Sequence, residues 1–112
     1  RKSGSMELKQ NQIISINLDP TIGIEMKKTR PCVIISPNEM NKFLKTIIIA
    51  PMTSNLKAYP TRIQINYDKR QGSVVLDQIR TVYILRVVKL LDALNEKDTT
   101  KVKKVLKETY VD

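Results

Sequence analysis

The 112-residue sequence has no histidine, no tryptophan and a single cysteine, Cys32. Ser-His-Asp triads, paired-histidine acid–base catalysis and zinc sites built on histidine or several cysteines are therefore excluded. One cysteine cannot form an internal disulfide, and no apolar run approaches the roughly 20 residues needed to cross a bilayer. We expect a cytoplasmic protein without a membrane segment.

What the sequence has in excess is positive charge. Lysine and arginine number 20 against 11 acidic residues, which gives a net charge of +9. A chain of this length supports one domain, and its charge favours a polyanionic partner, with nucleic acid ahead of an anionic membrane. We expect residues 1–5 to be a cloning remnant and residues 6–112 to form the single domain.

Short apolar segments dominate the hydrophobic pattern and predict a mainly β protein, a small barrel with a C-terminal helix. The expected helix spans Glu96 to Thr109, with Asn95 as its N-cap, and residues 38–43 are expected to form one helical turn. Asp68 to Gly72 is interpreted as a hairpin connection in which Gly72 supplies a positive φ. The expected strands are residues 12–18, 31–36, 46–51, 61–66, 73–79 and 86–93.

Chemistry-bearing residues gather first in the irregular segment from Asp19 to Arg30. It brings Glu25 together with cations that include Lys28 and Arg30, a set that could hold phosphate. Pro31 restricts Arg30 to an extended conformation at the entrance of a strand. The alternative is structural: Arg30 as a rim arginine paired with Glu25.

Two further polar groups follow buried strands. Thr53 and Ser54 offer hydroxyl donors suited to phosphate oxygens, unless they cap their own turn. Asp77, Gln78 and Arg80 make their segment too polar for a plain core strand, although an edge strand with structural ion pairs would look the same.

Four motifs, taken in order, resemble the MazF/PemK/Kid family of bacterial toxins. The similarity runs from about Gln12 to the C-terminal helix, and four ordered motifs are more specific than any one. Ile24 and Val75 stand where the Kid branch has histidine and arginine, so the MazF branch is the better match. The motifs are LDPTIGIE (residues 18–25), RPCVIIS (30–36), APMTS (50–54) and DQIRT (77–81).

The resemblance implies an SH3-like barrel of the CcdB/PemK/MazF type, a homodimer, and a metal-independent, cofactor-free endoribonuclease that cleaves single-stranded mRNA at specific sequences. It also implies an acidic antitoxin partner. By position, Arg30 and Thr53 match the family's catalytic pair. The positions that would line or support the RNA groove are Glu25, Ser54, Asp77, Gln78 and Arg80.

The economical metal-free reaction is attack by the RNA 2′-hydroxyl on the adjacent phosphate, giving a 2′,3′-cyclic phosphate and a 5′-hydroxyl. Arginine is a poor general base because it stays protonated at neutral pH, so Glu25 is the alternative candidate. With only five aromatic residues, base recognition is expected to rely on polar groups such as Asn41 and Gln78, with Lys28 holding phosphate.

Two other functions remain open. CcdB-type toxins share the barrel but poison DNA gyrase, and CcdB contacts gyrase through an end that includes a C-terminal tryptophan, which this chain lacks. A non-catalytic RNA-binding barrel would also fit the charge. Cleavage that depends on Arg30 separates these alternatives from the nuclease.

Overall fold

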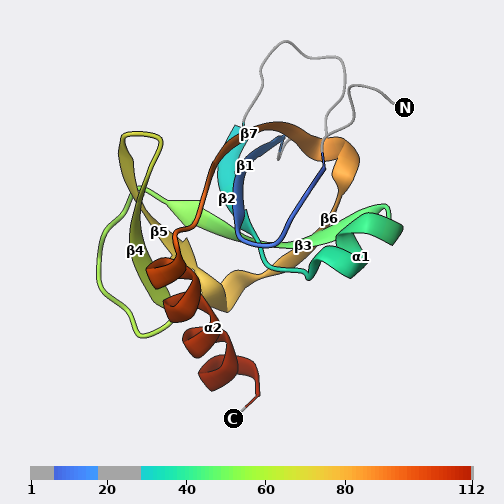
Figure 1. The fold of residues 1–112 in the computed structure, drawn as a ribbon. Helices are drawn as coiled ribbons and strands as arrows, with labels where there is room; N and C mark the ends of the chain where they lie inside the picture. The colour runs from blue at the N-terminus through green and yellow to red at the C-terminus, as the bar shows by residue number, and fades with distance from the viewer. Residues whose placement is uncertain (1–6, 18–28, 112) are drawn as a thin grey trace.

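The computed structural model describes residues 7–17 and 29–111. Seven strands form one curled sheet with the order β4-β5-β3-β2-β1-β7, and β6 also pairs with β3. Figure 1 shows β7, β1, β2, β3 and β6 around the curl, with the β4–β5 hairpin on one side. The elements are β1 (Gln12–Asn17), β2 (Thr29–Ile34), α1 (Asn38–Phe43), β3 (Thr46–Thr53), β4 (Arg62–Tyr67), β5 (Arg70–Val75), η1 (Leu76–Gln78), β6 (Arg80–Tyr83), η2 (Ile84–Arg86), β7 (Val87–Ala93) and α2 (Glu96–Tyr110).

The expected mainly β architecture with a C-terminal helix is confirmed. Both predicted helical segments are present, and Asn95 caps α2, its side-chain oxygen accepting a hydrogen bond from the main-chain N–H of Asp98 at 2.7 Å. An oxygen in this position satisfies one of the free N–H groups of the first turn.

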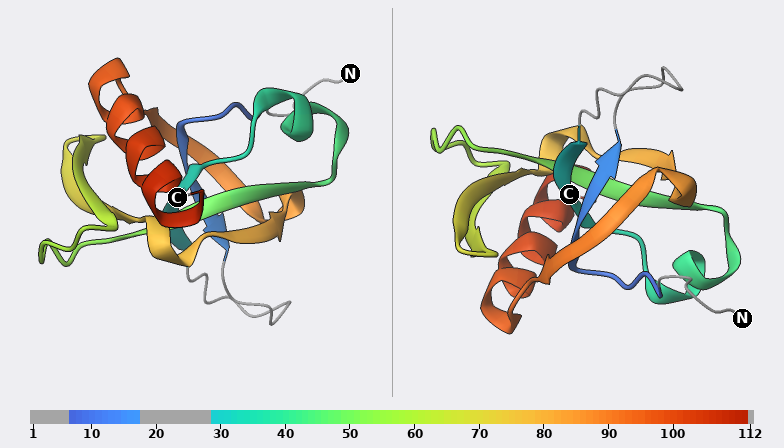
Figure 2. Two further views of the ribbon diagram at one scale, coloured as in Figure 1. Left: turned by 90° about the horizontal axis from the view of Figure 1, so that it is seen from below. Right: turned by 90° about the horizontal axis from the view of Figure 1, so that it is seen from above.

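Each face of the sheet carries its own hydrophobic cluster. Alternate residues of β2 separate cleanly, because Cys32 and Ile34 belong to one cluster and Val33 to the other. The cluster that contains Val33 also holds Val102 of α2, and both views of Figure 2 show α2 against the sheet. Burial of apolar surface on both faces fixes the register, since a slip of one residue would exchange the two sets.

The single strand expected at residues 73–79 is wrong. β5 ends at Val75, a 3₁₀ turn follows, and Arg80 begins a separate strand. β3 pairs with β6 through its first half and with β5 through Met52 and Thr53. The turn η1 lies between the two pairings, where the chain passes from one partner of β3 to the other.

The β4–β5 hairpin also differs from expectation. Its turn consists of Asp68 and Lys69, which adopt φ values of 45° and 63°, whereas Gly72 lies inside β5. A Cβ atom on Gly72 would come within 3.1 Å of the Met52 side chain, so close packing explains this glycine. The Asp92 carboxylate accepts a hydrogen bond from the Asp68 N–H at 2.9 Å, and this bond holds the pKa of Asp92 below its usual range.

Candidate active site

The main chain of Arg30 is fixed at the start of β2. Arg30 pairs with Ile16 of β1, and its carbonyl oxygen accepts a hydrogen bond from the Cys32 thiol at 3.7 Å. The side chain is exposed. A rigid backbone with an exposed guanidinium is the arrangement needed to present a planar, bidentate donor to a phosphate.

Thr53 ends β3 at the same edge of the sheet. Cys32 lies opposite Pro51, so extending this antiparallel register by two residues brings Arg30 opposite Thr53. The Thr53 Oγ1 accepts a hydrogen bond from the Asn55 N–H at 3.1 Å. The local turn expected as the alternative therefore exists, and it leaves the hydroxyl proton of Thr53 available to a ligand.

Arg80 completes a cationic group on this face. It begins β6 opposite Ile49 of β3, and its side chain is exposed. β2 and β6 pair with opposite edges of β3, so Arg30, in register with Thr53, and Arg80, opposite Ile49, lie on the two sides of this strand. Arg30 precedes Cys32 by two residues, and Arg80 precedes Val82 by two residues. Because side chains two residues apart in a strand lie on the same face, both arginines lie on the face that carries the cluster of Cys32 and Val82.

The charges of Arg30 and Arg80 both affect the pKa of the Cys32 thiol. Burial raises the pKa of Cys32 from 9.0 to about 12, and the positive charges of Arg30 and Arg80 oppose that rise. Both guanidinium groups therefore act on one buried sulfur atom. Because the thiol stays protonated at neutral pH, Cys32 is excluded as a nucleophile.

Asp77 and Gln78 occupy η1, which packs against β3. Both side chains are exposed, and the Asp77 carboxylate accepts a hydrogen bond from the Thr61 hydroxyl at 3.0 Å. Ser54 is exposed directly after Thr53. The structure thus brings Arg30, Thr53, Ser54, Asp77, Gln78 and Arg80 to the region where β2, β3, η1 and β6 meet.

Asn41 does not belong to this group. It is buried in α1, where its amide donates to the main-chain oxygen of Ser36 at 3.0 Å and its oxygen accepts from the Ser36 hydroxyl. α1 precedes β3, and the eight residues of β3 separate its two ends by roughly 23 Å. Asn41 therefore organises the α1 corner. Glu25 and Lys28 lie outside the described residues.

Several residues beside the candidate site were not expected from the sequence. Thr61 partners Asp77. Lys57, Tyr59 and Arg62 line a hollow that also includes Ser73, the β5 partner of Thr53. In the sequence, the basic residues Lys57 and Arg62 on either side of Tyr59 were the feature that could have pointed to this hollow. Within residues 7–17 and 29–111, no group of three His, Cys, Asp or Glu side chains could hold a metal ion, and no helix is long and apolar enough to span a membrane.

Comparison with known proteins gives the class of the molecule. Residues 9–110 match the family described as "PemK-like, MazF-like toxin of type II toxin-antitoxin system". The "Endoribonuclease MazF" of Staphylococcus saprophyticus is 30% identical over 80% of each chain. The "Endoribonuclease EndoA" of Bacillus subtilis (strain 168) is 27% identical over 90% of this chain and 92% of that protein.

The match to the "Endoribonuclease toxin MazF" of Escherichia coli (strain K12) is 30% identical and spans 62% of this chain, but only 63% of that relative. The fold agrees with a solved MazE-MazF structure from Deinococcus radiodurans, with a TM-score of 0.79, 21% identity, and coverage of 94% of this chain and 96% of that one. The chain belongs to the PemK/MazF toxin family.

Proposed function

We propose that this chain is a sequence-specific, metal-independent endoribonuclease toxin that cleaves single-stranded mRNA. The observation that carries the proposal is the β2–β3 register, which brings Arg30 and Thr53 to one edge of the sheet with Arg80 across β3. Relatives of this chain are named endoribonucleases, which supports the same activity. A cytoplasmic location follows from an mRNA substrate.

The reaction begins with the 2′-hydroxyl oxygen of the RNA, which attacks the adjacent phosphorus. The P–O bond to the next nucleotide breaks, leaving a 2′,3′-cyclic phosphate, and the departing oxygen takes a proton to become a 5′-hydroxyl. Arg30 donates to the phosphorane oxygens in bidentate fashion, and the Thr53 hydroxyl donates from the facing strand. Because the substrate supplies its own nucleophile, the protein supplies geometry, charge and proton transfer.

The 2′-hydroxyl must lose its proton, and Glu25 is our candidate base. Glu25→Gln should retain RNA binding and lower the rate of single-turnover cleavage. An unchanged single-turnover rate would remove Glu25 from the mechanism.

Recognition of the RNA requires bases held away from one another and contacted at their edges. We assign this to Lys28, Ser54, Asp77, Gln78 and Arg80, which supply phosphate contacts and hydrogen-bonding groups. We leave Asn41 out because its amide is buried and bonded to Ser36.

We further propose a homodimer and an acidic antitoxin. Exposed apolar side chains flank the contact at which the Ile84 N–H donates to the Lys45 carbonyl at 2.9 Å, and a partner copy would cover them. A related mycobacterial structure contains an endoribonuclease with its cognate antitoxin, and the charge of +9 on this chain suits an acidic partner. The exposed side chains are Phe43 (77%), Leu44 (49%), Tyr83 (62%) and Leu85 (92%).

The decisive experiment incubates the protein with long single-stranded RNA in EDTA and maps new 5′ ends. Wild type should cut at discrete sites, and Arg30→Ala or Thr53→Ala should slow cleavage by about 10²–10³-fold, since each removes one donor to the transition state. Lys103→Ala is the charge-matched control for Arg30, because Lys103 is exposed on α2.

The outcomes separate the three candidate functions. Persistent RNA binding by Arg30→Ala without cleavage supports catalysis. Wild-type binding without any cleavage would favour the non-catalytic barrel. Intact, unbound RNA would favour a CcdB-like action, which a gyrase inhibition assay would then test.

A further inference from the structure

The Ser73 side chain is a buried polar group without a partner. Ser73 lies in β5 with no exposed surface, and its Oγ makes no hydrogen bond within the described part of the chain. Buried hydroxyl groups are nearly always hydrogen-bonded, so an orphaned one points to a missing partner. Ser73 pairs with Thr53 of β3 on one side and Gln64 of β4 on the other, so the three side chains share one face.

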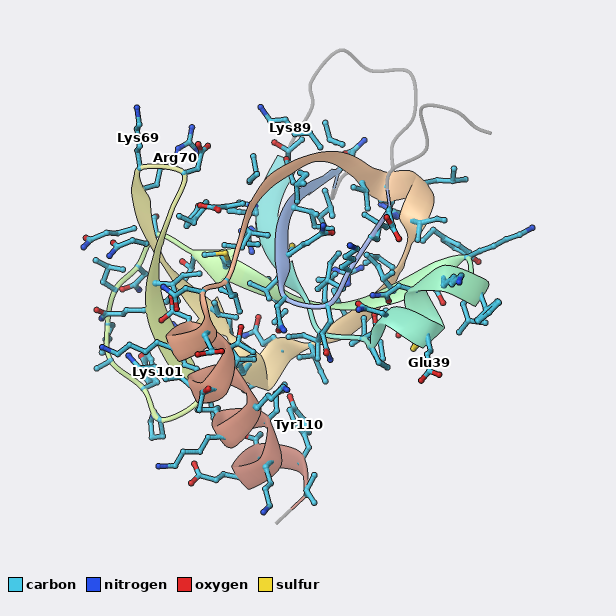
Figure 3. All side chains as sticks on the ribbon, viewed as in Figure 1. Glu39, Lys69, Arg70, Lys89, Lys101 and Tyr110 are labelled. Carbon is cyan, nitrogen blue, oxygen red and sulfur yellow. The ribbon has the colours of Figure 1, made fainter. Side chains whose placement is uncertain are left out.

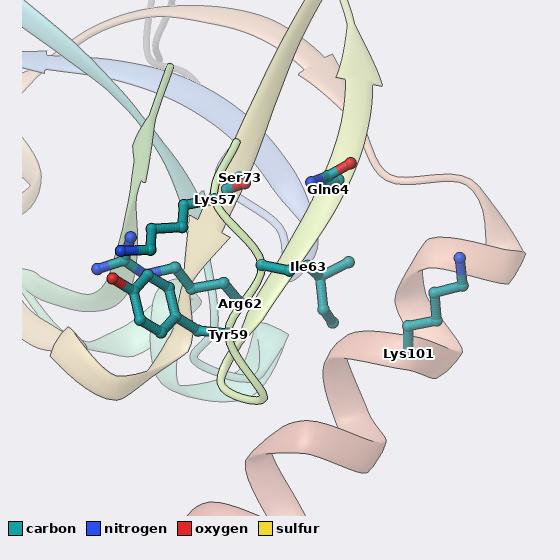
Figure 4. Close-up of a pocket in the computed structure, with 8 residues that line it drawn as sticks. Lys57, Tyr59, Arg62, Ile63, Gln64, Ser73 and Lys101 are labelled. Carbon is teal, nitrogen blue, oxygen red and sulfur yellow. The ribbon is translucent and has the colours of Figure 1, made fainter. Parts of the chain in front are cut away.

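A hollow of about 410 Å³ lies over this face, a size typical of small-ligand pockets. The loop at residues 54–60 passes above it and is tied to β4 by the Gln64 side-chain amide, which donates to the Leu56 carbonyl at 2.6 Å. Figure 4 shows its lining from the loop, from β4 and β5, and from α2. The polar lining consists of Lys57, Tyr59, Arg62, Gln64, Ser73 and Lys101.

Positive charge is concentrated at this pocket. The Arg62 guanidinium lies 4.5 Å and the Lys57 ammonium 5.6 Å from the centroid of the same Tyr59 ring. Tyr59 thus holds two like charges near each other through cation–π contacts. Figure 3 shows Lys101 on α2 beside the β4–β5 hairpin. The described lining residues include these three cations and no carboxylate, so the lining is positively charged.

We infer that this pocket binds a phosphate group of the RNA strand next to the one that is cleaved, an inference that rests on the proposed function. The Ser73 hydroxyl donates to a phosphate oxygen, Arg62 provides a planar donor, and the lysines add charge. Phosphate is favoured over the carboxylates of a protein partner because Ser73 lies directly beside Thr53 across the β3–β5 pairing. A strand held at Thr53 therefore continues into the pocket.

The test measures binding of single-stranded RNAs that contain the mapped cut site, with the 2′-hydroxyl at that site replaced by hydrogen. The RNAs are lengthened one nucleotide at a time in either direction. Affinity should rise when the added phosphate reaches the pocket, and Lys57→Ala and Arg62→Gln should each lower the salt dependence of binding by about one unit on the long RNAs. The controls are Lys103→Ala and Arg70→Gln, which remove charge from exposed positions outside the lining.

Ser73→Ala provides the sharpest variant. It breaks no hydrogen bond in the free protein, so the Tm should be unchanged or higher. Affinity for long RNA should fall roughly tenfold, the usual effect of losing a hydrogen bond to a charged group. Ser73→Thr retains the hydroxyl and should keep more affinity if it folds normally.

The outcomes of this test separate the pocket from the active site. If wild type cleaves RNA and the pocket variants bind every RNA as tightly as the controls do, the pocket inference is wrong and the proposed function stands. If long RNA binds through the pocket but is never cut, the proposed function is wrong and the phosphate site remains. If the variants lose affinity only for a synthetic acidic peptide, the ligand is a protein carboxylate and the inference is overturned.

Discussion

The hydroxyl of Tyr110, in the last turn of α2, donates a hydrogen bond to the main-chain oxygen of Leu76 at 2.6 Å. Leu76 is fully buried and is followed by Asp77 and Gln78 of the candidate site. The C-terminal helix thus holds the turn that presents these two side chains. We therefore expect Tyr110 to position these two side chains without contacting a substrate.

Tyr110→Phe removes this bond and little else. We expect the free energy of unfolding to fall by about 1 kcal/mol, the usual net value of such a bond. We also expect kcat/KM for RNA cleavage to fall, because η1 is less firmly held. Urea unfolding and cleavage kinetics measure the two effects, and unchanged kcat/KM despite lower stability would limit Tyr110 to a structural role.

Thr61 orients Asp77 through the 3.0 Å hydrogen bond from its hydroxyl to the carboxylate. Thr61→Val keeps the shape of the side chain and removes the donor, so we expect up to about a tenfold loss in kcat/KM. Thr61→Ser retains the donor and should restore most of the activity. If valine and serine behave alike, the hydrogen bond does not serve cleavage.

Cys32 should make stability sensitive to alkaline pH. Burial raises its pKa in the folded state from 9.0 to about 12, so above pH 9 the unfolded chain releases a proton that the folded chain retains. Its contribution to stability is present below pH 9 and is lost as pH rises toward 12. Relative to Cys32→Ala, the free energy of unfolding of wild type should fall by about 1.4 kcal/mol per pH unit in this window. Urea unfolding at pH 8, 9 and 10 measures it, and parallel pH profiles would contradict it.

The hairpin turn offers a stabilising substitution. Lys69 adopts a φ of 63°, a conformation that costs a side-chain-bearing residue energy and suits glycine. Lys69→Gly creates the Asp-Gly pair favoured in tight hairpin turns and should raise the free energy of unfolding by up to about 1 kcal/mol. Arg70→Gly, one residue further and inside β5, should be destabilising. Thermal unfolding of both variants provides the comparison, and a lower Tm for Lys69→Gly would refute the argument.

Hydrophobic alternation predicted most of the fold because it reports local burial. Strands β1, β2, β3, β4 and β7 appear within two residues of the expected ends, and the Asn95 cap marked the start of α2. The end of β5 at Val75 was missed because apolar residues continue beyond it, at Leu76 and Ile79, almost to the start of β6. The turn η1 between β5 and β6 is explained only by the three-dimensional pairing, in which β3 pairs with β6 in its first half and with β5 at its end.

The candidate site was less accessible to sequence reasoning. The motifs in the sequence identified Arg30 and Thr53 as candidates, but only the β2–β3 register shows that they lie opposite each other. Asn41 was expected to contact RNA because it is polar, but in the structure its side chain is buried and hydrogen-bonded to Ser36. The orphaned Ser73 hydroxyl leaves no trace in the sequence, since only the paired strands and the overlying loop bury it.

The loop at residues 54–60, over the Ser73 pocket, does not contribute to the hydrophobic core. Every residue from 54 to 60 is exposed, and neither hydrophobic cluster includes any of them. Substitutions there change the surface near Thr53 while leaving both clusters intact. Under the proposed function, substitutions in this loop can therefore change which RNA is recognised at little cost in stability.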